Sequence, residues 1–341
     1  MIRRTTLTAA IVGAGRIAGG YDAARRPGQT GVFTHAGAYR AHGGVKLKTV
    51  CETDPRAARS FQKRWKIPSA TTRLSDLTAG FHDVISICTP DRTHFAVASA
   101  LLEARCCRAI FLEKPAALDP REISELLRLS KKARIPVIVN FQRRVEPAHA
   151  ALRARVLVEA PFAVNAYYIK GLRHIGATMI DTLIFLLGKP RAVLAYNAAP
   201  SGMAGDPSVE FVLFFGRFNA TVKSADAPGG YAYHLFELDL LFRDRRVTIT
   251  ENSRRVRASR VGRFAYSGVN ALDEAGAVLT KTGFDRAMVA AVDYVRSAAL
   301  GRRHETNRLE DSYNGALIME AVQESLRRGR RIPIPEERWK K

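Results

Sequence analysis

The chain has 341 residues, 47% hydrophobic and 25% charged, and these proportions exclude a disordered or fibrous protein. Its 54 lysines and arginines outnumber its 32 acidic residues, which gives a net charge of +22. The excess favours an anionic small ligand, or it serves solubility alone. The basic residues lie in short, scattered clusters without a nucleic-acid-binding motif, so no specific nucleic-acid partner is expected.

The length exceeds that of one ordinary hydrophobic core, so two domains are expected. The four cysteines contain no Cys-x-x-Cys pair, which predicts neither a metal site nor a disulfide framework. No apolar run reaches the roughly 18 residues of a membrane span. We therefore expect a cytoplasmic protein that does not enter a membrane.

The first predicted strand, residues 7–12, runs directly into a glycine-rich turn. Residues 13–18 read Gly-Ala-Gly-Arg-Ile-Ala and match the pattern G-x-G-x-x-G/A, in which the glycines allow a tight turn and close approach of a pyrophosphate. The amides at the start of the next helix would face the phosphates. The predicted cofactor-binding residues here are Gly13, Ala14, Gly15, Arg16 and Ile17.

Residues 20–44 form an unusual segment, which the sequence predicts to be a loop inserted into the first crossover. It can be a surface excursion or a lid near the cofactor. The next strand, residues 45–51, ends in Glu52, an acid placed to bind the adenosine ribose hydroxyls and to disfavour a 2′-phosphate. This favours NAD, whereas the nearby Arg56 and Arg59 leave NADP open.

The following residues alternate between helical and buried-strand patterns. Strands are predicted at residues 84–88, 109–112 and 135–140, and helices at 55–65, 92–104 and 120–133. This alternation predicts a Rossmann-type, doubly wound parallel sheet over residues 1–140.

The apolar strand at residues 109–112 ends abruptly in Glu113, Lys114 and Pro115. Proline ends the strand, so the two charges stand at the carboxyl end of a buried parallel strand, where ligands bind in such sheets. Lys114 can act there as a proton donor or a point charge. The alternative is a plain strand exit with two solvated charges.

The pattern changes over residues 141–341. An extended segment at 162–170 and a compact helix at 176–187 are followed by strand-like runs with few helices between them, and two helices, 284–300 and 310–328, close the chain. We expect an α+β domain with a large, mostly antiparallel open sheet, which binds the substrate and forms oligomers. Its final helices can pack back on the first domain.

Five segments together resemble the Gfo/Idh/MocA oxidoreductases, the relatives of glucose–fructose oxidoreductase and inositol dehydrogenase. They are the glycine turn at residues 13–18, Cys-Thr-Pro-Asp-Arg-Thr-His at 88–94, Glu-Lys-Pro at 113–115, Gln-Arg-Arg-Val-Glu-Pro at 142–147, and Asn307 with Glu310 and Asp311. The resemblance covers nearly the whole chain, and the Glu-Lys-Pro motif is its most specific part.

The resemblance implies that Thr89, Pro90, His94 and Glu113 bind the cofactor and that Lys114 contacts both cofactor and substrate. A cis peptide bond before Pro115 is expected, since cis bonds occur almost only before proline. The resemblance also implies a homodimer or homotetramer formed through the outer face of the second sheet. No metal is implied.

The chain departs from the family pattern at the helix of residues 176–187. His174 occupies the usual aspartate position and Thr178 the usual histidine position, whereas Asp181 is kept. Positions 174, 178 and 181 would share one face of a helix. Thr178 can only hydrogen-bond, whereas His174 can take over a proton role or be a structural histidine. Lys114 is the other candidate base, and Asp181 can orient either group or hydrogen-bond locally.

We therefore expect an NAD(P)-dependent oxidoreductase that moves a hydride between nicotinamide and a secondary alcohol or ketone of a sugar, cyclitol or nucleotide-sugar, with Lys114 as the main proton-handling group. The basic balance makes an acidic substrate plausible, bound by residues that would include Arg144, Tyr168, Lys170 and His174. The alternative is a catalytically silent, dinucleotide-binding regulator similar to the yeast galactose co-repressor. The remaining histidines are interpreted as structural or surface residues: His35, His42, His82, His149, His234 and His304.

Overall fold

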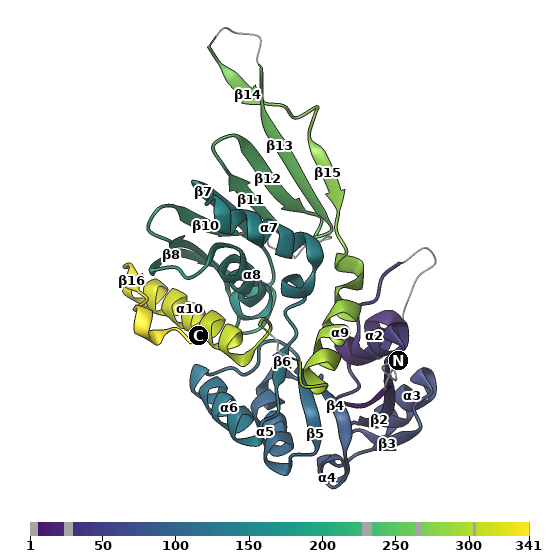
Figure 1. Cartoon of the computed structure of the whole chain (residues 1–341). Helices are drawn as coiled ribbons and strands as arrows, with labels where there is room; N and C mark the ends of the chain where they lie inside the picture. Colours follow the sequence, from purple (N-terminus) through teal and green to yellow (C-terminus); the bar gives the residue numbers. More distant parts are fainter. Residues whose placement is uncertain (1–5, 24–29, 227–233, 264–267, 303–304, 341) are drawn as a thin grey trace. The chain divides into compact units, whose positions relative to one another are not determined.

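The computed structural model describes residues 6–23, 30–226, 234–263, 268–302 and 305–340 (Figure 1). The chain divides into two compact units. The first combines Met1–Val145 with Asp285–Tyr313, and the second combines Glu146–Phe284 with Asn314–Lys341. Each unit is described by itself.

The first unit is built on a six-stranded parallel sheet, which confirms the predicted doubly wound architecture. The strand order reverses beside β1, and in such sheets dinucleotides bind beyond the carboxyl ends of the strands at this point. In spatial order the strands are β3 (Ser69–Thr71), β2 (Val45–Cys51), β1 (Leu7–Val12), β4 (His82–Ile87), β5 (Cys107–Leu112) and β6 (Val137–Val139).

Helices flank this sheet, and two of them begin at the caps that the sequence indicates (Figure 1). Asp54 and Asp119 accept the backbone N–H of the residue two positions later, at 2.8 and 2.7 Å, and a proline follows each cap. The α-helices are α1 (Tyr21–Ala23), α2 (His35–His42), α3 (Pro55–Trp65), α4 (Leu74–Thr78), α5 (His94–Ala104), α6 (Pro120–Ala133) and α9 (Ala287–Ala299). Short helical turns are η1 (Arg16–Gly20), η2 (Asp91–Thr93), η3 (Gln142–Val145) and η5 (Phe284–Arg286).

The inserted segment is not a plain surface loop, which corrects the sequence interpretation. It contains a helix, α2 (His35–His42), capped by Thr34, whose hydroxyl accepts the N–H of Gly37 at 3.2 Å. His35 and Tyr39 of this helix are buried, and α2 packs against α9. Residues 24–29 lie outside the described part of the chain.

The second unit is an open sheet with one parallel strand pair, β7–β10, whereas its other described pairs are antiparallel. This confirms the predicted mostly antiparallel sheet. Its spatial order is β14 (Asn270–Leu272), β13 (Arg255–Arg263), β12 (Arg245–Thr250), β11 (Phe236–Leu241), β7 (Ala163–Tyr168), β10 (Asn219–Ser224), β9 (Ser208–Phe214), β8 (Ala192–Ala199) and β16 (Ile332–Pro333), and β15 (Val278–Lys281) pairs with β13.

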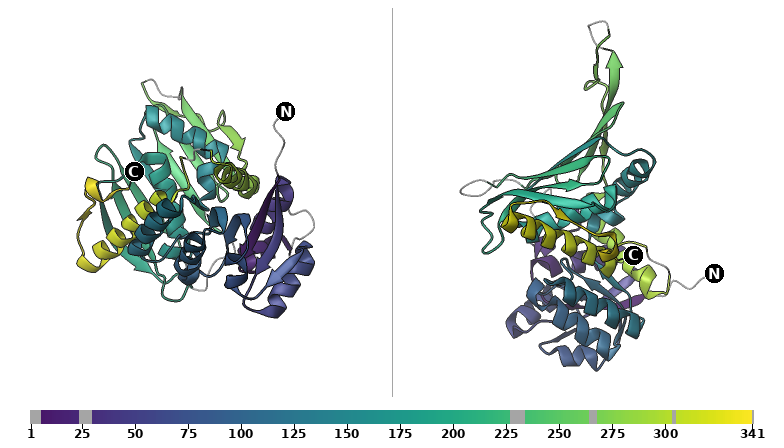
Figure 2. Two further views of the ribbon diagram at one scale, coloured as in Figure 1. Left: turned by 60° about the horizontal axis from the view of Figure 1, so that its bottom comes forward. Right: turned by 90° about the vertical axis from the view of Figure 1, so that its left-hand side faces the viewer.

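Three helices cover one face of this second sheet (Figure 2). They are α7 (Pro147–Val158), α8 (Ala177–Leu187) and α10 (Leu309–Arg328). The short helical turn η4 (Gly171–Gly176) directly precedes α8, and the turn η6 (Glu336–Arg338) follows β16. Alternate strand residues point into the core that these helices close, which is the pattern of a sheet with one covered face.

All four cysteines are buried and free of disulfides. Within the described ranges, no helix has the length and apolar character that crossing a bilayer requires.

Candidate active site

Gly13 lies where β1 turns into the next segment, and only glycine suits this position. Its φ of +92° is in the left-handed region, and a Cβ atom here would lie 2.8 Å from the carbonyl oxygen of Cys88. The N–H of Gly13 donates to the carbonyl of Cys51 at 2.8 Å. The turn is therefore fixed between the ends of β2 and β4.

Gly15 is a different case, because a Cβ atom added to it would meet nothing within 4 Å. The space beside its backbone is open at the position where a pyrophosphate approaches such a turn. The following residues form the turn η1, in which the amides of Gly19 and Gly20 donate to the carbonyl of Gly15 at 3.3 Å. Ala18 is fully buried, as the small third position of the pattern requires. The turn thus fits a dinucleotide.

Glu52 follows β2 and faces the glycine turn. One carboxylate oxygen accepts the N–H of Ala14 at 2.8 Å, and the other accepts the hydroxyl of Thr53 and the N–H of Asp54 at 3.1 and 3.2 Å. An acid at the end of the second strand, beside the glycine turn, is suitably placed for the ribose hydroxyls. Its contact with the cofactor stays a prediction.

Replacing Glu52 by glutamine should weaken the preference for NADH over NADPH. Glutamine can still accept the N–H of Ala14, but it removes the negative charge that would repel a 2′-phosphate. The dissociation constant of NADPH divided by that of NADH is expected to fall by about tenfold, which corresponds to about 1.4 kcal/mol. Fluorescence titrations of both nucleotides measure it, and an unchanged ratio would contradict the assigned position.

His94, at the start of α5, links two loops at the ligand edge of the sheet. Its Nδ1 lies 2.7 Å from the carbonyl of Pro115 and its Nε2 lies 2.9 Å from the carbonyl of Thr89. Because backbone carbonyls occupy both ring nitrogens, His94 positions these loops, and a direct contact with the cofactor would have to use its ring carbons. The hydroxyl of Thr89 is buried without a hydrogen-bond partner among the described residues, and a bound ligand would satisfy it.

Glu113 lies at the end of β5, and its carboxylate is held from two sides. One oxygen lies 2.9 Å from His35 Nε2 and accepts Asn140 Nδ2 at 2.5 Å. Burial favours the neutral acid. The hydrogen bonds of His35 and Asn140 and the charge of Lys114 outweigh it, so the pKa of Glu113 is lowered. Glu113 is therefore a buried carboxylate, not a solvated charge.

The sequence interpretation missed His35, which it placed among the structural or surface histidines. The signal that could have found it is the run His35–Tyr39, whose small residues are typical of a helix packed closely on a sheet. The ring is fully buried and packs at a tilt against Phe111 of β5, with centroids 4.4 Å apart and an angle of 48° between the ring planes. The consequence for Lys114 is developed below.

Lys114 is half-buried and follows Glu113 directly. The Lys114–Pro115 peptide bond is cis, as expected. Pro90 is exposed, beside Thr89 at the end of β4, the strand next to β5. The predicted cofactor residues of the first unit thus follow adjacent parallel strands at one edge of the sheet, while their contacts with a cofactor remain predictions.

Arg144 does not have the environment of a substrate ligand. It is buried in the first unit, where its Nη1 forms an ion pair with Asp311 at 3.1 Å and lies 3.5 Å from the hydroxyl of Thr306. Asn307 acts in the same region, accepting the N–H of Val139 at 2.7 Å. These residues join the late segment of the chain to the edge of the parallel sheet, so the proposed substrate role of Arg144 is withdrawn.

Tyr168 is also a structural residue, contrary to the expectation of substrate binding. It is fully buried in the core of the second unit, because it shares the inward face of β7 with Val164 and Ala166. Its hydroxyl donates to the carbonyl of Val209 and accepts the N–H of the same residue, both at 2.7 Å. Burial raises its pKa, so the phenol stays protonated.

Replacing Tyr168 by phenylalanine should therefore lower stability without changing substrate affinity. The backbone groups of Val209 lose their buried partner, which costs about 1 to 3 kcal/mol. Urea unfolding measures the loss. A changed KM in a variant of normal stability would restore Tyr168 to the substrate site.

Lys170 directly precedes η4, and His174 lies within it. Lys170 has a left-handed backbone, φ +69°, and its N–H donates to the carboxylate of Asp226 at 3.0 Å. His174 is exposed, and its N–H donates to the carboxylate of Asp206 at 3.0 Å. His174 thus precedes α8 rather than lying on it, which corrects the expectation of one helical face for residues 174, 178 and 181.

Thr178 and Asp181 lie one turn apart on α8. Thr178 is half-buried, and Asp181 is 1% exposed within an otherwise mostly apolar helix. Aspartate is rarely buried so deeply, least of all on a mostly apolar helix, which makes Asp181 a candidate for a functional role. Lys114 belongs to the first unit and these residues to the second, so their joint action is a proposal.

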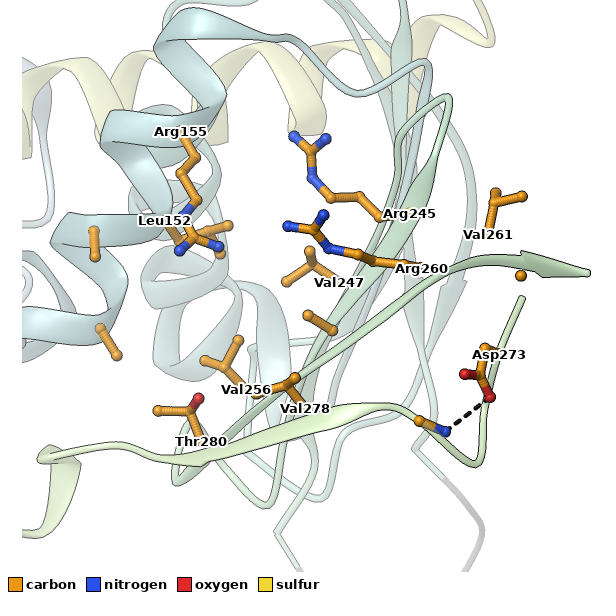
Figure 3. Close-up of a pocket in the computed structure, with 15 residues that line it drawn as sticks. Leu152, Arg155, Arg245, Val247, Val256, Arg260, Val261, Asp273, Val278 and Thr280 are labelled. Atoms are coloured by element: carbon orange, nitrogen blue, oxygen red, sulfur yellow. Dashed lines mark hydrogen bonds between the residues drawn. The ribbon is translucent and has the colours of Figure 1, made fainter. Parts of the chain in front are cut away.

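A pocket of about 660 Å³ lies in the second unit between α7 and the strands β12, β13 and β15 (Figure 3). Its walls are largely apolar, and Arg155, Arg245 and Arg260 gather on one side. None of the site residues predicted from the sequence lines it. Among the described residues, no group of three or more acidic, histidine or cysteine side chains could hold a metal ion.

Comparisons with known proteins agree with the first unit's geometry. The model of the "Oxidoreductase family, NAD-binding Rossmann fold" matches residues 7–141. Inositol 2-dehydrogenase of Rhizobium meliloti (strain 1021) is 27% identical over 58% of this chain and 66% of its own length. D-glucoside 3-dehydrogenase of Escherichia coli (strain K12) is 25% identical over 56% of this chain and 57% of its own. The chain thus spans less than two thirds of these curated relatives.

The likeness in fold extends further than the likeness in sequence. The solved structure of levoglucosan dehydrogenase in complex with NADH and levoglucosan superposes with a TM-score of 0.78 at 18% identity, and it covers 97% of this chain and 100% of its own. Both units therefore have counterparts in one known fold. Residues 7–141, with the glycine turn and the ligand edge of the sheet, thus match the model of the Gfo/Idh/MocA oxidoreductases with an NAD-binding Rossmann fold.

Proposed function

We propose that the protein is an NAD-dependent dehydrogenase that oxidises a secondary alcohol of a sugar-like substrate, or reduces the corresponding ketone. The observation that carries the proposal is the half-buried Lys114, which follows the buried carboxylate Glu113 at the ligand edge of the dinucleotide-binding sheet. The relatives named above act on inositol and on a glucoside, which supports a polyhydroxylated substrate.

In the oxidation, bound NAD would supply the hydride acceptor, the C4 atom of nicotinamide. Lys114, as the free amine, would take the hydroxyl proton while the carbinol hydrogen leaves with its electron pair. Glu113 would hold the resulting ammonium by its charge. In the reverse direction the ammonium would return the proton to the carbonyl oxygen.

Residues of the second unit would bind the substrate. We assign this role to His174, Lys170 and Asp181, with Thr178 as a hydrogen-bonding group only. His174 is exposed and can exchange protons near neutral pH, so it is the second candidate for acid–base catalysis. The positive charge of the chain favours an anionic sugar or a nucleotide-sugar among possible substrates.

A panel of cyclitols, glycosides, sugar acids and nucleotide-sugars, incubated with NAD or NADP, tests the proposal. The absorbance of reduced nicotinamide at 340 nm should rise for at least one class. A homodimer or homotetramer is proposed from the family resemblance, and light scattering of the eluting protein tests it. Absence of turnover across the panel, together with tight nucleotide binding, would favour the second candidate.

That second candidate is a regulator that binds NAD without catalysis. Thr178 favours it, because the family resemblance implies a histidine at this helix position and a hydroxyl there cannot act as a base at neutral pH. The Thr178→His variant separates the two ideas. An enzyme relying on Lys114 already turns over without this change, whereas a regulator that lost its base would gain activity only with it.

A further inference from the structure

A continuous chain of buried polar side chains runs beneath the end of β5. Tyr39 Oη lies 2.6 Å from Ser86 Oγ, Ser86 Oγ lies 2.9 Å from His35 Nδ1, and His35 Nε2 lies 2.9 Å from Glu113. Tyr39, Ser86 and His35 are at most 1% exposed, and Glu113 is 7% exposed. The chain joins α2 to β4 and β5, and it ends at the residue before Lys114.

The direction of these hydrogen bonds follows from what each group can donate. An ionised carboxylate only accepts, so His35 must carry its proton on Nε2. His35 Nδ1 can then accept from Ser86, whose oxygen accepts in turn from Tyr39. Burial raises the pKa of Tyr39, which keeps this phenol a donor. Every member of the chain is thereby satisfied.

Among the hydrogen-bonded side chains of Tyr39, Ser86, His35 and Glu113, the negative charge resides on Glu113. The groups that face its carboxylate are His35 from α2, Asn140 after β6, Lys114 beside it and the thiol of Cys88 after β4. The thiol is neutral, because burial and the charge of Glu113 raise its pKa. Of the polar groups that stabilise the carboxylate, His35 contributes most, through the hydrogen bond that its Nε2–H donates.

We propose that His35 is a positioning residue of the active site: its Nε2–H keeps Glu113 ionised and fixed, and Glu113 in turn stabilises the ammonium form of Lys114, which the oxidation produces and the reduction consumes. The inserted segment therefore serves catalysis from within the fold. The effect of His35 on turnover rests on the proposed function, whereas its effect on the protonation of Lys114 does not.

Two substitutions separate the two ring nitrogens. In His35→Gln the amide lies near the former Nε2 position and can still donate to Glu113. In His35→Asn the shorter side chain lies near the former Nδ1 position and leaves the carboxylate without this donor. Burial already favours the neutral acid, so loss of the His35 donor should raise the pKa of Glu113 even though Asn140 still donates to it, and the neutral share of Glu113 at pH 7 should rise in this variant only.

Trace acetylation with acetic anhydride, resolved by mass spectrometry, reports how much of Lys114 is the free amine. The exposed Lys132 serves as the internal reference. At pH 7, with and without NADH, His35→Asn should raise the relative labelling of Lys114 by about tenfold, the effect of one pKa unit. Glu113→Gln should do the same, and His35→Gln should match the unmutated protein.

Equal labelling in His35→Asn and the unmutated protein, both folded, would overturn the proposal. So would an equal rise in both His35 variants, because a purely structural histidine predicts no difference between them. If neither variant folds, the unmutated protein still decides: ¹H–¹⁵N spectra should show His35 protonated on Nε2, and a bare Nε2 would overturn the assignment.

Activity gives a second readout if the panel yields a substrate. Loss of the Nε2 donor should move the acid limb of the kcat profile for the oxidation to lower pH in His35→Asn, because a larger share of Lys114 is then the free amine, and it should leave KM unchanged. A protein without any turnover would refute the proposed dehydrogenase activity, and the labelling of Lys114 would still test the role of His35.

Discussion

Replacing Lys114 by alanine is expected to abolish turnover while leaving NADH binding nearly intact. Loss of a positioned proton-transfer group lowers kcat by about 10²- to 10⁴-fold. The glycine turn and Glu52, which we expect to hold the adenosine half of the cofactor, lie on other strands and are unaffected. Steady-state kinetics measure the first effect, and fluorescence titration with NADH measures the second.

A second substitution distinguishes the two roles open to Lys114. Arginine keeps the positive charge but does not release its proton in the accessible pH range. If Lys114 exchanges the substrate proton, Lys114→Arg should be as inactive as Lys114→Ala. If it only polarises the oxygen, arginine should retain part of the activity.

The matched control is Lys132→Ala, which removes an exposed lysine on α6. It should leave kcat and KM unchanged. Turnover by Lys114→Ala within a factor of about three of the control would contradict the proposed mechanism, since such a change is less than 1 kcal/mol in the barrier.

Local sequence signals were sufficient for most of the fold. The buried strands are short apolar runs, and α3 and α6 begin with an aspartate cap followed by proline. The sequence did not reveal β3 and α4, with 3 and 5 residues, because so few residues establish no periodicity. The helix α2 was taken for a loop because half of its residues are alanine or glycine, which carry little hydrophobic pattern.

The site residues likewise divide into those that local sequence signals predict and those that depend on partners distant in the sequence. The glycine turn could be located because its backbone conformation demands specific residue types. The error at Tyr168 was avoidable, since the alternation of Val164, Ala166 and Tyr168 already predicts one buried face. Partners distant in sequence could not be predicted. His35 meets Glu113 across 78 residues, and no local pattern records that pairing.

Substitutions at the two glycines of the turn should fail in different ways, because the structure gives them different surroundings. Gly13→Ala should lower the free energy of unfolding by about 2 to 5 kcal/mol. Part of this cost is the left-handed backbone that alanine resists, and part is the collision of its Cβ with the carbonyl of Cys88. Urea unfolding of the purified variant measures the loss.

Gly15→Ala should instead fold normally and lose affinity for NADH. The backbone of Gly15 has a φ of −73°, which alanine adopts without strain, and its Cβ would meet no protein atom within 4 Å. The added methyl group would occupy only the open space that the cofactor needs. A clash costing about 1 to 3 kcal/mol would weaken NADH binding by about 10- to 100-fold.

The comparison of the two variants is more informative than either alone. If the pyrophosphate binds over this turn, Gly15→Ala separates binding from stability, and its unfolding midpoint should equal that of the unmutated protein. Unchanged NADH affinity in Gly15→Ala would place the pyrophosphate elsewhere. Equal destabilisation of both variants would mean that the space beside Gly15 is filled by protein, which would contradict the open turn on which the cofactor assignment depends.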